Sequence, residues 1–211
     1  MFGNFDTRTF LPRLLALVIA IAIHEFAHAA SAMALGDDTA RRQGRLTLNP
    51  VAHFDPVGFI MLAFMAAFGF GFAWGRPVPV NPYALRGGRR GMALTAFAGP
   101  LSNLVQAALA VAVLRLVGAA QVESQPFLAF LNTYIVINIL LAAFNMLPVP
   151  PLDGYNVLMG VVSDFWVQRL EPLRNAGVGL LLLLVFFGYQ YVSTYAIGPV
   201  AGLFARIVGY G

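Results

Sequence analysis

Two histidines and a glutamate lie close together in an apolar stretch near the N-terminus. In AIAIHEFAHAAS, residues 20–31, His24 and His28 are four positions apart, so a helix places both imidazoles on one face, where they can bind one metal ion. Glu25 directly follows His24, and a carboxylate at that position can accept a proton from metal-activated water. The HExxH pattern therefore predicts zinc-dependent hydrolysis, with one Zn²⁺ per chain.

The apolar surroundings of these residues strengthen the prediction. The chain is 59% hydrophobic and only 10% charged, against roughly 25% charged residues in a soluble domain, so we predict an integral membrane protein. An ionisable side chain at the bilayer centre costs about 2.5–3.5 kcal/mol on insertion scales and points to a functional site. The simpler interpretation, that the three side chains only join helices by hydrogen bonds, leaves Glu25 without a task.

A catalytic zinc ion needs a third protein ligand and an open position for water. The chain has no cysteine, so this ligand has to be a histidine or a carboxylate, and His53, Asp55 and Asp153 are the candidates. Asp153 stands in FNMLPVPPLDGYN, where an apolar helix is predicted to break at a proline-rich turn. Irregular backbone at membrane depth is tolerated where it lines a cavity. The alternative for Asp153 is a plain Asp-Gly surface turn.

The elements that position these residues are predicted from apolar runs at 10–35, 57–74, 92–118, 127–147 and 177–192, with a weaker run at 197–209. Runs of this length predict an all-α polytopic membrane protein with four to five transmembrane helices. RLTLNP alternates and predicts a short β-strand or hairpin near residues 41–50. The chain, 1–211, is predicted to be one membrane-embedded domain, with a catalytic core at about 10–160 and C-terminal helices at about 171–211.

The segment 57–74 decides whether the candidate ligands can meet. If every apolar run crossed the membrane, His24 would lie about 21 Å along its helix from the side of Asp153, too far for both to bind one ion. A re-entrant segment 57–74, which returns to the side it left, puts the two residues at a similar depth. We therefore predict a re-entrant segment here.

The arginines give an independent indication of topology. With a re-entrant segment, nine of the 13 arginines share one side, which the positive-inside rule assigns to the cytoplasm. We therefore expect a multi-pass protein of the inner membrane with its active site toward the cytoplasm. The nine are Arg41, Arg42, Arg45, Arg76, Arg86, Arg89, Arg90, Arg169 and Arg174.

Three motifs carry a resemblance to a known family. HEFAH, AGPLSN and FNMLPVPPLDG occur in this order, and together they resemble the site-2 protease family of intramembrane zinc metalloproteases, in its short bacterial form without a PDZ or CBS domain. The resemblance covers roughly residues 10–160. It implies that His24, His28 and Asp153 are the zinc ligands and that Glu25 is the general base. It also implies that Asn145 hydrogen-bonds the reacting carbonyl or its oxyanion; a helix-capping or interhelical amide is the alternative.

Three more polar residues are candidate accessory residues. Asn103 in GPLSN is expected to order helices rather than to touch substrate. His53 in NPVAHFDP is expected to be a loop histidine held by Asp55 rather than a second ligand.

The predicted reaction is hydrolysis of peptide bonds in or near transmembrane segments of membrane-anchored proteins, as in regulated intramembrane proteolysis. A substrate helix has to unwind before it is cut, and an extended segment could pair with the strand predicted at RLTLNP. The arginines form no stripe with aromatic residues, so they suit anionic lipid headgroups and not nucleic acid. The alternative function is a non-proteolytic zinc-binding membrane protein, for transport or as a scaffold. The sequence identifies neither the substrate nor the oligomeric state.

Overall fold

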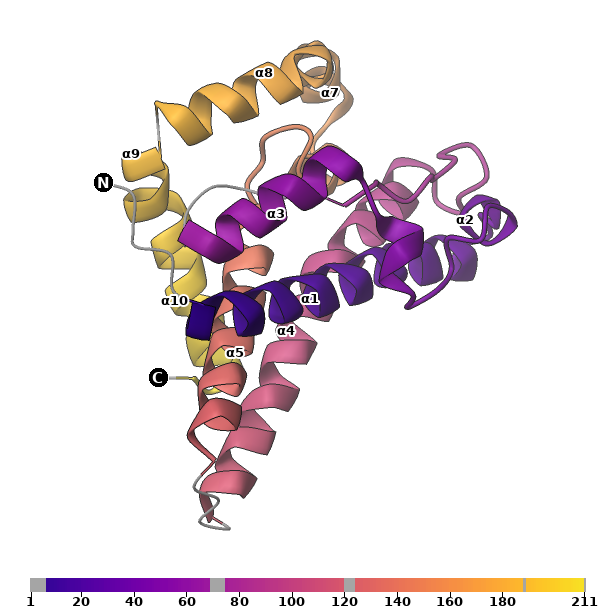
Figure 1. Ribbon diagram of the computed structural model, residues 1–211. Coiled ribbons are helices and arrows are strands. Elements are labelled where there is room, and N and C mark those ends of the chain that lie inside the picture. The colour runs from indigo at the N-terminus through magenta and orange to yellow at the C-terminus, as the bar shows by residue number, and fades with distance from the viewer. Residues whose placement is uncertain (1–6, 69–74, 120–123, 188, 211) are drawn as a thin grey trace.

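The computed structural model describes residues 7–68, 75–119, 124–187 and 189–210, and the regular secondary structure in these ranges is all helical (Figure 1). The all-α fold predicted from the apolar runs is therefore confirmed. The elements include one 3₁₀ helix, η1, and one π-helical turn, η2. In chain order they are α1 (Thr7–Ala34), α2 (Thr39–Arg42), η1 (Pro50–His53), α3 (Pro56–Phe68), α4 (Arg89–Ala119), α5 (Gln125–Asn145), α6 (Asp153–Val161), α7 (Asp164–Leu170), α8 (Leu173–Phe186), α9 (Tyr189–Val192), η2 (Ser193–Ile197) and α10 (Gly198–Val208).

Among the described residues, four helical stretches are long and apolar enough to cross a bilayer, whose hydrocarbon core requires roughly 20 residues. They are Thr9–Ala34, Arg89–Gly118, Gln125–Asn145 and Gln190–Val208. The chain is therefore a multi-pass membrane protein. The first three stretches agree with the apolar runs at 10–35, 92–118 and 127–147.

The last of the four spans differs from the prediction. The run at 177–192 falls mainly in α8, which has 14 residues and measures about 21 Å, short of the roughly 30 Å of hydrocarbon. The weaker run at 197–209 belongs to the fourth span instead, because α9 continues through η2 into α10. A π-helical turn keeps the backbone hydrogen-bonded, so the polar residues in this stretch do not end the helix.

The helices α4 and α5 form an antiparallel hairpin, and α1 crosses both of them steeply (Figure 1). At the hairpin interface, Ala107 and Ala110 of α4 pack against Leu131, Ile135 and Ile139 of α5. Lipid tails are as apolar as these side chains, so close packing of small residues, rather than escape from water, holds such helices together.

The segment predicted to be re-entrant begins with α3, which packs on α1 through Leu62 and Ala66 against Leu17. Residues 69–74, the rest of the predicted segment, lie outside the described residues. The backbone N–H of Arg76 donates to the carbonyl of His53 at 2.9 Å, so the chain returns after the segment to the place from which it left. This closure agrees with a re-entrant segment and disagrees with a crossing.

The β-strand predicted near residues 41–50 is wrong, because no strand forms there. The hydrogen-bonding groups that a strand would offer to a neighbour are used locally. The Thr47 hydroxyl accepts from the N–H of Asn49 at 3.1 Å, and the Thr47 carbonyl accepts from Nε2 of His53 at 2.9 Å. The Asn49 side chain then caps η1 by accepting from the N–H of Val51 at 3.0 Å. Alternation in RLTLNP therefore reflects a local turn, and substrate pairing at this stretch loses its basis.

Three of the described arginines contact neighbouring helices or helix ends. Arg86 donates to the carbonyl of Ala34 at 2.5 Å, and Arg89 forms an ion pair with Asp164 at 2.6 Å. Arg115 donates to the carbonyl of Gly209 at 2.7 Å.

Candidate metal centre

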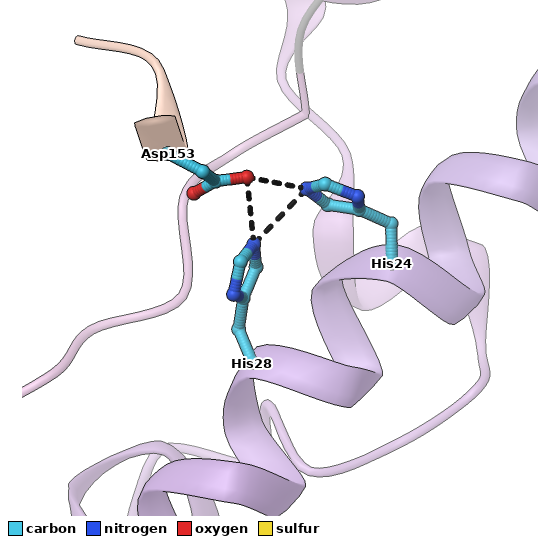
Figure 2. A group of neighbouring side chains, drawn as sticks. All are labelled: His24, His28 and Asp153. Carbon is cyan, nitrogen blue, oxygen red and sulfur yellow. Dashed lines mark hydrogen bonds and ion pairs between the residues drawn. The ribbon is translucent and has the colours of Figure 1, made fainter. Parts of the chain in front are cut away.

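Three side chains from two helices meet beside the middle of α1 (Figure 2). His24 and His28 project from successive turns of α1, and Asp153 is the first residue of α6. The two imidazole Nε2 atoms lie 3.0 Å apart, and Oδ2 of Asp153 lies 3.2 Å from that of His24 and 3.3 Å from that of His28. The side chains are only 10%, 11% and 17% exposed, so bulk water competes little for them.

The turn after α5 and a glycine bring Asp153 to this point. A Cβ on Gly154 would lie 2.3 Å from the carbonyl oxygen of Met146, a separation that no other residue tolerates. The glycine of the Asp-Gly pair thus lets α6 begin directly against the end of α5. Leu147 and Leu152 of the turn pack with Leu181 of α8, which covers the turn. The Asp-Gly pair is therefore a tight helix junction and not a plain surface turn.

A second glycine lets α4 approach the two histidines. A Cβ on Gly99 would lie 2.4 Å from Nε2 of His28 and 2.6 Å from Cε1 of His24. Any side chain at this position would occupy the space of both imidazoles. Gly99 stands in AGPLSN, but the motif does not mark it as part of the site, because its importance depends on the distance between α1 and α4.

The other nitrogen of each imidazole is bound to an oxygen of α4. Nδ1 of His24 lies 2.7 Å from Oδ1 of Asn103, and Nδ1 of His28 lies 2.7 Å from the carbonyl oxygen of Thr95. Pro100, inside α4, has no N–H to donate. The carbonyl of Ala96, the residue after Thr95, therefore lacks its usual partner in the helix. Because the partners of both Nδ1 atoms are oxygens, both Nδ1 atoms carry a proton and donate, and in the neutral imidazole Nε2 then holds the lone pair that binds a metal ion.

The three converging atoms fit a zinc ion. In a tetrahedral zinc site with bonds of about 2.1 Å, the ligand atoms lie about 3.4 Å apart, close to the separations of 3.0–3.3 Å seen here. Oδ2 of Asp153 is buried and has no hydrogen-bond donor, and two imidazole lone pairs face it. With both imidazoles neutral, these electron-rich atoms repel one another, and a shared metal ion removes the repulsion. Among the described residues, only this group could hold a metal ion.

Glu25 is held beside this group by the segment 76–81. Its Oε2 accepts from the backbone N–H of Val78 at 3.1 Å. The same segment is tied to the end of α1 a second time, because Oδ2 of Asp37 accepts from the N–H of Asn81 at 2.7 Å. Segment 76–81 thus forms a fixed wall along α1, and one oxygen of the Glu25 carboxylate is oriented by it.

Asn145 and Asn103 play different parts in the structure. The amide of Asn145 is half-buried at the end of α5 and donates to the carbonyl of Leu141 at 3.0 Å, which leaves its second hydrogen for another acceptor. Asn103 is fully buried and, besides bonding His24, donates to Asn138 of α5 at 2.9 Å. The expectation that Asn103 orders helices is met, but this residue also touches a candidate ligand. Asn138, a polar residue inside an apolar run, escaped the sequence analysis.

His53 and Asp55 lie apart from the three candidate ligands. The expectation that Asp55 holds His53 is wrong. His53 donates from Nε2 to the Thr47 carbonyl at 2.9 Å, while Oδ1 of Asp55 accepts from the N–H of Gly58 at 2.7 Å and caps the first turn of α3. Both residues instead shape the entrance to α3, since each is used by a local turn.

Comparison with known proteins places this architecture in a family. The model of Peptidase family M50 matches residues 113–187, a range that includes Asn145 and Asp153. The chain is 37% identical over 179 residues to YwhC of Bacillus subtilis, an alignment that covers 82% of this chain and 78% of the relative. It is 32% identical over 194 residues to Rip2 of Mycobacterium tuberculosis, with 89% of this chain and 70% of the relative covered. The names of both relatives describe candidate zinc metalloproteases. No solved structure matched the chain.

The fold and the three converging side chains are those of a multi-pass membrane protein with a candidate metal centre among its spanning helices. The chain belongs to Peptidase family M50, the site-2 protease family of intramembrane zinc proteases.

Proposed function

We propose that this chain is an intramembrane zinc endopeptidase in which His24, His28 and Asp153 bind a single Zn²⁺ and Glu25 is the general base. The observation that carries the proposal is the convergence of three ligand atoms within 3.3 Å of one another beside a glutamate, with both histidines on a helix apolar enough to span a membrane. The names of the relatives, which describe zinc metalloproteases, also support it.

The residues around the centre have distinct tasks in this reaction. When bound, zinc would polarise the scissile carbonyl and lower the pKa of the attacking water. The Glu25 carboxylate accepts the proton of that water and later delivers it to the leaving amine nitrogen. The Val78 N–H fixes Oε2 of Glu25, so the proton is handled by a carboxylate of defined orientation.

Asn145 is proposed to hold the substrate carbonyl. Its amide lies at the end of α5, and the turn that follows leads to Asp153. One amide hydrogen is bound to the Leu141 carbonyl, and the other is proposed to donate to the substrate oxygen as negative charge develops there. A fixed donor of this kind typically contributes about 10²–10³-fold in rate.

The substrate is proposed to be a membrane-anchored protein cut in or near its transmembrane segment. A peptide bond inside a helix is hydrogen-bonded and shielded by side chains, so the segment has to become extended before it reaches Glu25. The site is proposed to open toward the cytoplasm from the inner membrane, because the arginines of the loops around it follow the positive-inside rule.

The orientation can be tested with two matched cysteines, since the chain has none of its own. Ser163 and Ser124 are both exposed and neither side chain caps its helix. We expect Ser163→Cys to react with a membrane-impermeant reagent from the cytoplasmic face and Ser124→Cys from the opposite face. Labelling of both from one face would contradict the proposed topology.

The decisive experiment combines zinc content with cleavage of a defined substrate. Wild type, Glu25→Gln and Asp153→Asn are purified without chelators, resupplied with zinc and reconstituted in vesicles with a single-span model protein whose helix contains a glycine pair. We expect about one zinc per chain in wild type and in Glu25→Gln, and less in Asp153→Asn. Cleavage is expected in wild type only, with a loss of about 10²–10⁴-fold in Glu25→Gln.

Two results would overturn the proposal. A folded wild type that retains no zinc after resupply would show that the three side chains form no metal centre. Equal cleavage by wild type and Glu25→Gln, with zinc bound in both, would remove Glu25 as the general base.

A further inference from the structure

A chain of buried hydrogen bonds connects His24 with the far side of α5, and the proposed reaction does not use it directly. Nδ1 of His24 meets Oδ1 of Asn103 at 2.7 Å. Asn103 donates from Nδ2 to Oδ1 of Asn138 at 2.9 Å, and Asn138 donates from Nδ2 to the backbone carbonyl of Tyr134 at 3.0 Å. Both asparagines are 0% exposed, so water cannot replace any of these partners.

The direction of the whole chain is fixed at its last member. A backbone carbonyl can only accept, so Asn138 has to turn its NH₂ group toward Tyr134 and its oxygen toward Asn103. Asn103 then has to donate to that oxygen, which turns its own oxygen toward His24. Facing an oxygen, Nδ1 of His24 has to carry the proton, and Nε2 keeps the lone pair that a metal ion needs.

From this sequence of dependences we infer that Asn138 is a positioning residue that selects the metal-binding tautomer of His24 through Asn103, without touching a ligand itself. The inference rests on the proposed zinc site and adds a remote determinant to it. It also gives the three crossing helices a shared task, because His24, Asn103 and Asn138 come from α1, α4 and α5.

Removal of Asn138 should release this selection. Asn138→Leu keeps a similar shape but offers no acceptor, so nothing decides which way the Asn103 amide faces. With its NH₂ group toward His24, Nδ1 accepts and the proton moves to Nε2, where it blocks the metal. Outer partners of ligating histidines typically contribute about 10–100-fold to metal affinity. For Asn138→Leu we expect zinc affinity to fall about tenfold, the low end of this range, because Asn138 acts through Asn103.

Asn103→Asp should remove the dependence on Asn138. A carboxylate presents oxygen to His24 in either orientation, so Nδ1 keeps its proton whatever stands at position 138. Asn138→Leu is therefore expected to weaken zinc binding about tenfold in the wild-type background. In the Asn103→Asp background the same substitution is expected to weaken it less than about twofold. A residue that only stabilised the helix pair would give the same loss in both backgrounds.

The experiment measures zinc affinity of the purified full chain by competition with a chromophoric chelator. The variants are wild type, Asn138→Leu, Asn103→Asp and the double variant. Asn132→Leu is the matched control, because Asn132 also lies in α5 and donates to its own helix, at the Leu128 carbonyl, but has no link to His24; we expect it to bind zinc as wild type does.

A second readout reports the tautomer without metal or activity. The chain contains only three histidines, so nitrogen NMR of the metal-free protein labelled at histidine can distinguish a proton on Nδ1 from one on Nε2. We expect His24 to carry it on Nδ1 in wild type and in the double variant, and to populate the Nε2 form in Asn138→Leu.

The outcomes separate this inference from the proposed function. An unchanged His24 spectrum and wild-type zinc affinity in Asn138→Leu would overturn the inference and leave the zinc site intact. Equal losses in both backgrounds would overturn it as well, since they indicate a general loss of packing. If wild type bound no zinc, the proposed function would fail, and the tautomer spectrum would still decide the role of Asn138.

Discussion

The α4–α5 hairpin and the fourth span, which ends in α10, are both apolar enough to cross a membrane, but they are used differently by the fold. The helix α5 buries Leu131, Ile135, Asn138, Ile139, Ala142 and Ala143, whereas no residue of α10 is buried. The hairpin also contains the buried amides that reach His24. The helix α10 contributes partly buried side chains, such as Phe204, to the outer surface of the hairpin.

The difference shows that hydropathy identifies what can enter a bilayer but not what holds the candidate centre in place. Glycine, asparagine and alanine of the hairpin allow close approach and hydrogen bonding between helices. The apolar side chains of α10 face surroundings as apolar as themselves. We therefore propose that the catalytic core occupies about residues 10–160 and that α10 supports it from outside.

The largest contrast is expected between two glycines, one in each region. Gly99→Ala would place a methyl group within 2.4–2.6 Å of both imidazoles, so the rings have to move. A misplacement of about 1 Å can cost about 100-fold in rate, and we expect at least this loss of cleavage together with loss of zinc. Zinc content and cleavage of the single-span substrate measure the effect.

Gly202→Ala in α10 is the control, because nothing lies within 4 Å of the added Cβ. This variant should bind zinc normally. It should also unfold at a slightly higher temperature, because alanine is a better helix former than glycine by about 1 kcal/mol. Normal zinc binding in Gly99→Ala would contradict the close approach of α4 to the histidines.

A second contrast concerns packing alone. Ile135 is 0% exposed and Leu203 is 56% exposed. Ile135→Ala leaves a cavity in the hairpin, and we expect a loss of about 2 kcal/mol, the lower end of the usual range, because lipid offers no transfer gain. Leu203→Ala should stay within about 0.5 kcal/mol. Equilibrium unfolding in mixed micelles measures both, and equal effects would show that α10 is part of the core.

A third pair lies two positions apart in α8 and sharpens the boundary between core and support. A Cβ on Gly177 would lie 2.9 Å from Cβ of Pro150, while a Cβ on Gly179 meets nothing within 4 Å. Gly177→Ala should push the turn that leads to Asp153 and weaken zinc binding a few-fold, and Gly179→Ala should not. Identical zinc affinities would exclude α8 from positioning Asp153.

The smallest effect is expected in the pH dependence of stability, through Asp37, which holds segment 76–81 against the end of α1. Burial alone would raise the pKa of Asp37, but hydrogen bonds from the Thr39 hydroxyl and from the backbone N–H groups of Asn81 and Thr39 hold the pKa below its ordinary value. A lowered pKa contributes stability that is present above the unfolded value of about 3.9 and is lost as the pH falls through the folded value.

The melting temperature of wild type should therefore fall between about pH 5 and pH 3 more steeply than that of Asp37→Asn, which has no carboxyl group to titrate. Thermal unfolding in detergent over this range tests the comparison, with Asp38→Asn, an exposed neighbour, as the control. Parallel curves for wild type and Asp37→Asn would contradict a stabilising carboxylate at this position.

The sequence predicted the long helices, and it offered the candidate ligands, for identifiable reasons. Long apolar runs fix α1, α4 and α5, because few other structures satisfy so many apolar residues in a bilayer. His24 and His28 follow from helix geometry alone. Asp153 required the proline-rich turn and the resemblance to site-2 proteases, and the structure brings it within 3.3 Å of both histidines.

The residues that the sequence could not identify act through distances between helices. Gly99 is important only because α4 lies against the imidazoles, and Asn138 only because a second asparagine faces it from α4. RLTLNP failed as a strand because the alternation of side chains does not reveal that Thr47 and Asn49 use their hydrogen bonds locally. The fourth span was misassigned because a π-helical turn carries the helix past polar residues.

The hydrogen bond between the carbonyl of His53 and the N–H of Arg76 closes the intervening segment into a loop. Its two ends are fastened to each other, so its length is uncoupled from the coordinates of the histidines. Doubling the length of a closed loop costs only about 0.6 kcal/mol. The part of the molecule inserted beside α1 can therefore change in length at little cost while the metal-binding group stays where it is.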